Sequence, residues 1–337
     1  KGFGAESKVY DTSWYDEKKD TFEIDTVAEL YGFAELSKTE DFKEKTVKLT
    51  ATLDINPGWA ASTTSTTPKY SWTPIENFAG TFDGGMNTIS GIYLKSNETC
   101  LGMFREVSGT VQNLILDNSY IENTATKGKS GTGCVVGRLS GTLQAVKSSA
   151  DVVLNGSEYA GGLVGDITAE GGKIENSWFA GSLCGSGSHH GTLLGGVRTE
   201  GASATITNCL STGSIDLRGN TGGLVGALWD GATLSMKESL FAGKFVDVGA
   251  SRVWNHGTIT GNIGNGELTS SKVYSQKYSL VSRVLGNKGD NSQTGILAFE
   301  AEYLTGENGY RNCNLDFYEA TSNAEGKWVV LEDAVPG

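Results

Sequence analysis

Short apolar runs bracketed by glycine recur along this chain about every thirty residues, and this repeat limits the possible folds more than any other feature. The first residues of these runs are Gly102, Gly133, Gly161, Gly191, Gly222 and Gly257. Each run spans only a few residues, which suits a short β-strand, and a single repeat of this size cannot bury its own apolar face. Stacked coils can do so, because each strand then pairs with its equivalent in the next coil.

Two further strand-like runs follow within each repeat. One set is found at 109–113, 141–144, 173–176, 205–208 and 233–235, and the other at 181–185 and 213–217. Three short strands per coil, separated by glycine-rich corners that allow positive φ, are typical of a solenoid. The sequence therefore predicts an all-β fold, namely a right-handed parallel β-helix.

Alignment of the repeats also predicts which side chains lie above one another. Asn176, Asn208 and Glu238 fall in one column of the aligned coils. Stacked asparagine side chains can hydrogen-bond along the axis of a solenoid at a corner. We expect this column to mark one such corner.

The runs at 161–165 and 222–226 both read Gly-Gly-Leu-Val-Gly and resemble the GLUG repeat, which is named for its Gly-Leu-(variable)-Gly core. Residues 24–30 and 78–91 are similar to the segment that usually precedes such coils, so the likeness covers roughly residues 22 to 265. GLUG repeats occur in bacterial surface proteins and in non-catalytic regions of immunoglobulin-A1 peptidases. The resemblance implies a β-helix in an extracellular bacterial setting, and it specifies function poorly.

The chain is expected to form one continuous domain with three parts. Residues 1–56 would form an N-terminal cap and the strands that lead into the coils, residues 57–265 the coils, and residues 266–337 the last coil and a C-terminal cap. Within the last part, the apolar run at 328–331 is expected to form a final strand. Thr26 and Glu29 form a capping-box pattern, which predicts a short helix near 26–37 that closes the N-terminal end.

The Ser/Thr-rich stretch at 57–73 interrupts the repeat and contains Trp59, Tyr70 and Trp72. It is either a mobile surface loop or a segment whose aromatic rings stack on sugars.

Composition and charge exclude several classes of function. The 39 acidic and 27 basic residues give a formal net charge of -12, which argues against nucleic-acid binding because nothing would neutralise the phosphates. No apolar run approaches the roughly twenty residues of a membrane span, so no membrane insertion is expected. The five cysteines include no CxxC pair, and most are interpreted as small core residues. We expect a monomer that binds no metal and needs no cofactor.

The chain begins at Lys1 without an initiator methionine. A signal peptide and any cell-wall anchor are therefore expected to lie outside this sequence. The protein is expected to be secreted or attached to the cell surface.

Three acidic residues, Glu170, Glu200 and Asp230, lie at equivalent turns after successive glycine-bracketed strands. The register predicts that they share one edge with Arg198 and Trp229. Carboxylates would be about 5 Å apart on adjacent coils and about 10 Å apart on alternate coils, a range that includes both glycosidase geometries. These residues are the catalytic candidates, and the alternative is that they are exposed turn acids of an acidic protein.

All three histidines of the chain, His189, His190 and His256, lie at the corner that precedes the repeat glycines. Tyr159, His189, Asn220 and Asn255 fall in one column of the aligned repeats, and Arg252 and Trp254 lie nearby in the sequence. Such a corner suggests a sugar-binding ridge, general acid–base chemistry or a metal site. The metal site is the weakest of these, because no carboxylate or thiolate lies at a suitable spacing. The alternative is that corner insertions collect polar residues without a shared role.

Two functions remain open from the sequence. The first is an extracellular surface region that binds glycans or host proteins without catalysis, favoured by the regular repeat and by the absence of GxSxG, HExxH and P-loop motifs. The second is a polysaccharide-acting enzyme, either a glycoside hydrolase or a lyase, with its site on the side of the β-helix. A purely structural stalk is a third alternative.

Overall fold

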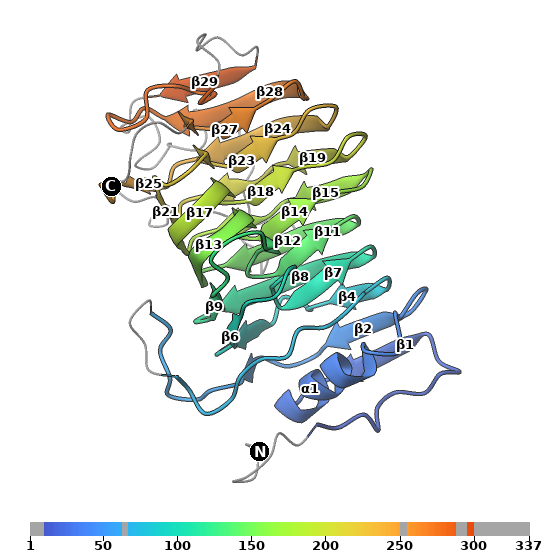
Figure 1. Cartoon of the computed structure of the whole chain (residues 1–337). Helices are drawn as coiled ribbons and strands as arrows, with labels where there is room; N and C mark the ends of the chain where they lie inside the picture. The colour runs from blue at the N-terminus through green and yellow to red at the C-terminus, as the bar shows by residue number, and fades with distance from the viewer. Residues whose placement is uncertain (1–9, 63–66, 250–254, 288–294, 300–337) are drawn as a thin grey trace.

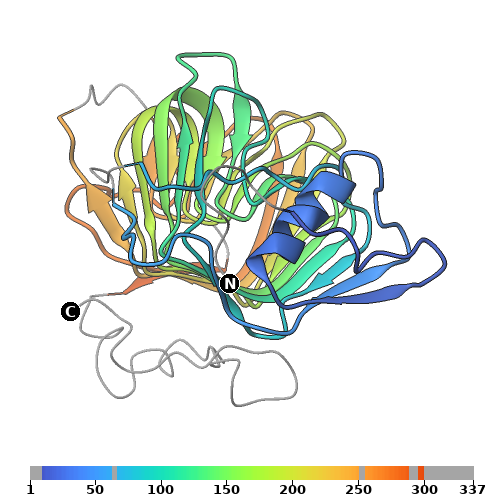
Figure 2. The ribbon, with the colours of Figure 1, turned by 90° about the horizontal axis from the view of Figure 1, so that it is seen from below.

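The computed structural model describes residues 10–62, 67–249, 255–287 and 295–299. The chain folds into a right-handed parallel β-solenoid of about seven turns, so the predicted fold class is confirmed. Figure 1 shows the coils stacked in chain order, with the N-terminal strands beside the helix and β29 at the opposite end. Figure 2 is a view along the axis of the solenoid, in which the sheets form its walls.

Three parallel sheets form these walls in the described part of the chain. The largest sheet has fourteen strands, and the second strand-like run of each repeat lies in it. Its strands are β1 (Thr21–Ile24), β2 (Thr46–Leu49), β3 (Leu53–Asp54), β4 (Thr81–Asp83), β5 (Thr88–Ser90), β8 (Thr110–Asp117), β12 (Thr142–Ser148), β15 (Gly172–Glu175), β16 (Trp178–Phe179), β19 (Ser203–Thr207), β20 (Leu210–Ser211), β24 (Thr233–Phe241), β28 (Glu267–Gln276) and β29 (Ile296–Phe299).

The other two sheets carry the remaining described strands. The glycine-bracketed runs, expected as strands, instead form the bends that lead into the six-stranded sheet, and only their last residues belong to its strands. These strands are β7 (Phe104–Val107), β11 (Val136–Leu139), β14 (Val164–Ile167), β18 (Leu194–Val197), β23 (Val225–Leu228) and β27 (Thr260–Ile263). The nine-stranded sheet contains β6 (Tyr93–Ser96), β9 (Tyr120–Asn123), β10 (Ser130–Thr132), β13 (Asp151–Gly161), β17 (Ser182–Gly191), β21 (Ser214–Asp216), β22 (Thr221–Gly222), β25 (Lys244–Val246) and β26 (His256–Gly257).

The interior is filled by columns of apolar side chains from successive coils. Leu143 pairs with Ile174, which pairs with Ile206, and all three are 0% exposed. Large and small residues alternate in a second column, where Phe179 lies between Ser148 and Ser211. Alternation of this kind lets the layers interlock at the packing density of a protein interior.

The predicted asparagine column is present at the bend of the fourteen-stranded sheet. Asn208 donates from Nδ2 to Oδ1 of Asn176 over 2.8 Å, and both residues have left-handed backbones with φ of 52° and 48°. Glu238 occupies the next coil with φ of 50°, in agreement with the predicted column. Asparagine tolerates this conformation better than most residues with a β-carbon, so it suits both the bend and the hydrogen bond.

The predicted N-terminal cap is also confirmed. Helix α1 (Val27–Leu36) begins after Thr26, and the reciprocal capping box between Thr26 and Glu29 is formed. Phe33 is 0% exposed and its ring packs against Phe42 and Phe82, so the helix covers the apolar end of the first coils (Figure 2). Covering this end prevents it from templating the pairing of another chain. The predicted strand at 328–331 lies outside the described residues.

The aromatic residues of the 57–73 segment are used in packing. Trp72 is 3% exposed, and its indole Nε1 donates to the carbonyl of Met103 over 3.0 Å. The ring of Trp59 meets Tyr93 edge-on, with ring centroids 5.9 Å apart. Trp72 is therefore not available to stack on a sugar, and the segment holds itself against the first coils through this ring.

Among the described residues, no helix has both the length and the apolar character needed to cross a bilayer.

The asparagine column provides a test of the bend. We expect Asn208→Ala to lower the free energy of unfolding by about 2 kcal/mol, because it removes one hydrogen bond and places alanine in a left-handed conformation. Asn208→Gly should cost only about half as much, because glycine accepts that conformation. Urea denaturation of both variants measures the free energy of unfolding. An equal decrease in both variants would show that the left-handed backbone conformation of residue 208 does not contribute to the cost.

Candidate functional site

The corner before the glycine-bracketed strands carries a continuous column of polar side chains, which we call the corner ladder: Tyr159, His189, Asn220 and Asn255. The rings of Tyr159 and His189 are stacked, with centroids 4.5 Å apart and planes 6° from parallel. The Asn220 amide lies 3.1 Å from Nε2 of His189, and Asn255 Nδ2 donates to Asn220 Oδ1 over 3.0 Å. The structure therefore brings together the column that the register predicts.

Backbone conformation turns the first two rings of the ladder out of the regular strand direction. Tyr159 and His189 have φ values of 52° and 66°. A β-carbon on Gly196 would lie 2.8 Å from Cδ1 of Tyr159, so a glycine is required where the tyrosine ring passes. Gly196 is not one of the repeat glycines, since its register partners are Asp166 and Ala227, so this coil has a glycine of its own that makes room for the tyrosine ring.

The three histidines share this corner but have different surroundings. His189 belongs to the ladder, and burial lowers its pKa to about 4. His190 is 2% exposed, and burial lowers its pKa to about 3. His256 Nε2 lies 3.1 Å from the carbonyl of Gly219. At neutral pH the first two are uncharged, and His190 is too deeply buried to touch a ligand on the surface.

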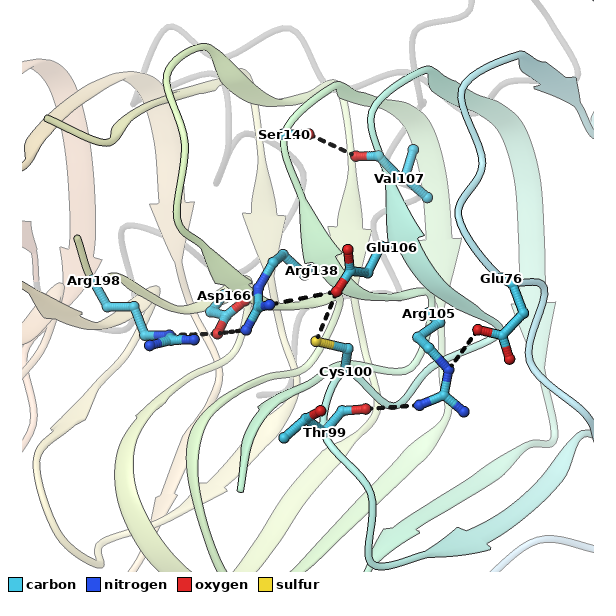
Figure 3. A network of polar contacts seen from close by, with 10 residues as sticks. All are labelled: Glu76, Thr99, Cys100, Arg105, Glu106, Val107, Arg138, Ser140, Asp166 and Arg198. Atoms are coloured by element: carbon cyan, nitrogen blue, oxygen red, sulfur yellow. Dashed lines mark hydrogen bonds and ion pairs between the residues drawn. The ribbon is translucent and has the colours of Figure 1, made fainter. Parts of the chain in front are cut away.

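A charged network lies beside the ladder on the six-stranded sheet. Asp166 is fully buried and accepts hydrogen bonds from Arg138 Nε at 2.8 Å and from Arg198 Nε at 2.6 Å. Figure 3 shows its carboxylate between the two guanidinium groups. Arg138 also reaches Glu106 at 3.4 Å, and the Cys100 thiol donates to Glu106 at 3.5 Å. Opposite charges on successive coils therefore neutralise one another, as a buried carboxylate requires.

The hydrogen bond to Asp166 raises the pKa of Arg138 above its ordinary value. Burial raises the pKa of the Cys100 thiol to about 12, so Cys100 is an uncharged thiol rather than a reactive thiolate at neutral pH.

Arg198 connects the network to the corner ladder. Its guanidinium carbon lies 5.5 Å from the centre of the Tyr159 ring, a distance at which a cation interacts with an aromatic face. Its side chain is 27% exposed, so Arg198 is partly accessible from solvent.

Asp166, Arg138 and Glu106 were not among the residues selected from the sequence. A usable signal existed, because Glu106, Arg138 and Asp166 occupy one register position on three successive glycine-bracketed strands and alternate in charge.

The three acidic candidates occupy equivalent exposed turns. Glu170, Glu200 and Asp230 are each followed by a glycine with φ between 75° and 86°. Asp230 is engaged by the next coil, because Asn265 donates its backbone N–H to Oδ1 at 2.6 Å and its side-chain amide to Oδ2 at 3.2 Å. Two hollows of 260 and 370 Å³ lie near the last described coil, beside Tyr278, and none of the three acids lines them.

Trp229 extends from the same row of turns and is 50% exposed. Its backbone N–H donates to the carbonyl of Val197 over 2.8 Å, and the N–H of Arg198 donates to Ile167 over 3.1 Å. These bonds hold Arg198 and Trp229 at neighbouring turn positions on adjacent coils. Trp254, the remaining candidate, lies outside the described residues.

Comparison with known proteins supports the fold and leaves the family open. No protein-family model matches the chain, so the likeness to the GLUG repeat remains a resemblance. Halomucin of Haloquadratum walsbyi is 35% identical over 121 residues, and the match covers 32% of this chain but only 1% of halomucin. A crystal structure described as a "putative immunoglobulin A1 protease" from Bacteroides ovatus aligns with a TM-score of 0.61 over 91% of each chain. Its sequence identity of 19% shows a shared fold and no more.

Burial of His190 predicts loss of stability in acid. Its pKa of about 3 in the folded protein is below the ordinary value of 6.5, so the unfolded chain takes up a proton first as the pH falls. This stabilisation is fully present well above pH 6.5 and is lost progressively as the pH falls toward 3. The loss of unfolding free energy reaches about 2 kcal/mol at pH 5.

The matched variant for this prediction is His190→Thr, because Thr221 occupies the same register position on the next coil. Denaturant unfolding at pH 8 and pH 5 should show a smaller pH-dependent loss in His190→Thr than in the natural protein. An identical loss in both proteins would show that His190 does not cause it.

Proposed function

We propose that this chain is the ligand-binding region of an extracellular bacterial β-helix protein and that it binds glycans without catalysis of its own. The binding surface is the row of turns that carries Arg198 and Trp229, and the buried ring of Tyr159 in the corner ladder supports Arg198 from below. The observation that carries the proposal is the half-exposed Trp229 on a turn that is hydrogen-bonded to the coil before it.

An exposed indole on a rigid turn is suited to carbohydrate recognition. A tryptophan ring offers a broad apolar face and a polar N–H, so it can pack against the C–H face of a sugar. Rigid placement reduces the entropy that is lost when a ligand binds. On the neighbouring turn, the guanidinium group of Arg198 provides N–H donors for the oxygen atoms of a sugar.

Binding is favoured over glycoside cleavage by the surroundings of the acids. Both oxygens of Asp230 already accept hydrogen bonds from Asn265, and Glu170 and Glu200 are exposed. Cleavage by paired carboxylates needs one group kept protonated by its environment, and exposure to water works against this.

The extracellular setting rests on two supports. The first is the GLUG-like sequence of the glycine-bracketed runs. The second is the fold shared with the Bacteroides ovatus protein, whose description names immunoglobulin A1, an antibody found outside cells. We include in the proposal a single continuous domain over residues 1–337, with 266–337 as the last coil and cap.

Binding to an immobilised glycan panel tests the proposal. Trp229→Ala should weaken binding about tenfold or more, because the stacking surface is removed. Tyr10→Ala is the matched control, since Tyr10 is 51% exposed and lies at the opposite end of the described chain, and it should bind normally. Binding to a host-protein array but to no glycan would reject the glycan assignment.

The same panel is also assayed for newly formed chain ends. We expect no cleavage, and we expect Glu200→Gln to bind like the natural protein. Cleavage that disappears in Glu200→Gln would establish a glycan-acting enzyme in place of a binding region.

A further inference from the structure

We propose that Arg198 binds a carboxylate of an acidic sugar, so that the ligand of this surface is a glycan with isolated negative charges. The inference rests on the proposed function and specifies the class of glycan. Its starting point is that Arg198 uses only Nε within the protein, while Nη1 and Nη2 have no hydrogen-bond partner among the described residues.

Arg198 is held in place before any ligand arrives. Asp166 Oδ2 accepts from Arg198 Nε at 2.6 Å, and the same carboxylate is fixed from the other side by Arg138. The Tyr159 ring lies against the guanidinium at 5.5 Å. Engagement of Nε and contact with the ring together restrict rotation of the planar group. The pair of Nη nitrogens then remains as a fork of the kind that binds a carboxylate through two parallel hydrogen bonds.

The local charge balance leaves Arg198 able to accept an anion. Asp166 carries one negative charge between two arginines, and the second arginine, Arg138, also pairs with Glu106. Positive charge at Arg198 is therefore only partly compensated on its buried side. Its partly exposed side can gain a further charge-assisted hydrogen bond.

The wider charge distribution limits which anion can bind. The chain has a net charge of -12, and Glu158 and Glu170 lie close to the site in sequence and register. A densely charged polymer would be repelled from such a surface. A glycan with a single carboxylate, such as one that ends in a sialic or uronic acid, gains the contact with Arg198 and avoids most of the repulsion.

The spacing of the coils allows one ligand to use both groups. Arg198 and Trp229 occupy neighbouring turn positions on adjacent coils, and their backbones are separated by about 4.8 Å. A disaccharide can therefore stack one ring on Trp229 and direct the carboxylate of its neighbour toward Arg198.

Matched ligand pairs measure the contribution of the carboxylate. The probes are 3′-sialyllactose with lactose, cellobiuronic acid with cellobiose, and the methyl ester of each acid. Calorimetric titration of the natural protein should show at least one acid bound tenfold to a hundredfold more tightly than its neutral partner and its ester. The neutral sugar and the ester both lack the carboxylate, so neither can form the pair of charge-assisted hydrogen bonds with Arg198.

Arg198→Gln should abolish this preference, so that on this variant each acid binds no more tightly than its neutral partner. Arg105→Gln is the matched control, because Arg105 is as exposed as Arg198, at 26%, and also pairs through Nε with a carboxylate, that of Glu76, and it should keep the preference. Arg198→Lys retains the charge without the two-nitrogen fork and should lose most of the preference. It also provides the test if Arg198→Gln does not fold.

The outcomes separate this inference from the proposed function. Equal binding of the acids and their neutral partners, or a preference that survives in Arg198→Gln, overturns the assignment of Arg198 while glycan binding stands. Binding of an acidic peptide that depends on Arg198, with no acidic sugar bound, also overturns it. Absence of all sugar binding, in both the natural protein and Trp229→Ala, rejects the proposed function itself.

Discussion

Parallel hydrogen bonding between equivalent segments of successive coils is the constraint on which the rest of this structure depends. Once Leu143 pairs with Ile174 and Ile174 with Ile206, every neighbouring residue is assigned to a column and to one face of a sheet. A slip of one residue would turn each apolar column toward solvent, so the buried face specifies the register strongly. The long core therefore does more than stabilise the solenoid, because it also determines which polar residues lie above one another on the surface.

The candidate site is a direct consequence of that stacking. The same pairing that aligns Val136 with Val164 aligns Arg138 with Asp166, and it places a buried carboxylate within reach of arginines from two other coils. At the corner it stacks Tyr159 on His189 and continues through two asparagines. Each surface feature spans several coils, so its side chains are held as rigidly as the strands that carry them. The ladder and the charged network are therefore positioned by the strands, whereas Glu170, Glu200 and Asp230 lie on exposed turns.

Much of the fold could be predicted from the sequence because periodicity depends only on spacing. The coils, the helix capped by Thr26 and the column of Asn176 and Asn208 all follow from residue types at fixed intervals. Contacts that cross from one wall to another do not follow from spacing. The position of Arg198 over Tyr159 depends on the left-handed backbone of the tyrosine and on the glycine opposite it. Burial of Trp72 depends on a loop that folds back on the first coils, and a Ser/Thr-rich stretch carries no signal of this.

Distances between spin labels along one column test the stacking most directly. Thr46, Thr205 and Thr269 lie in a single outward-facing column of the fourteen-stranded sheet. Labels introduced through an unnatural amino acid avoid the native cysteines. With about 4.8 Å per coil, the Thr46–Thr205 pair should be separated by about 24 Å and the Thr46–Thr269 pair by about 34 Å. Double electron–electron resonance distances that rise with the number of intervening coils would agree with these values. Distances that do not increase with coil number would contradict the parallel stacking and, with it, every surface column described above.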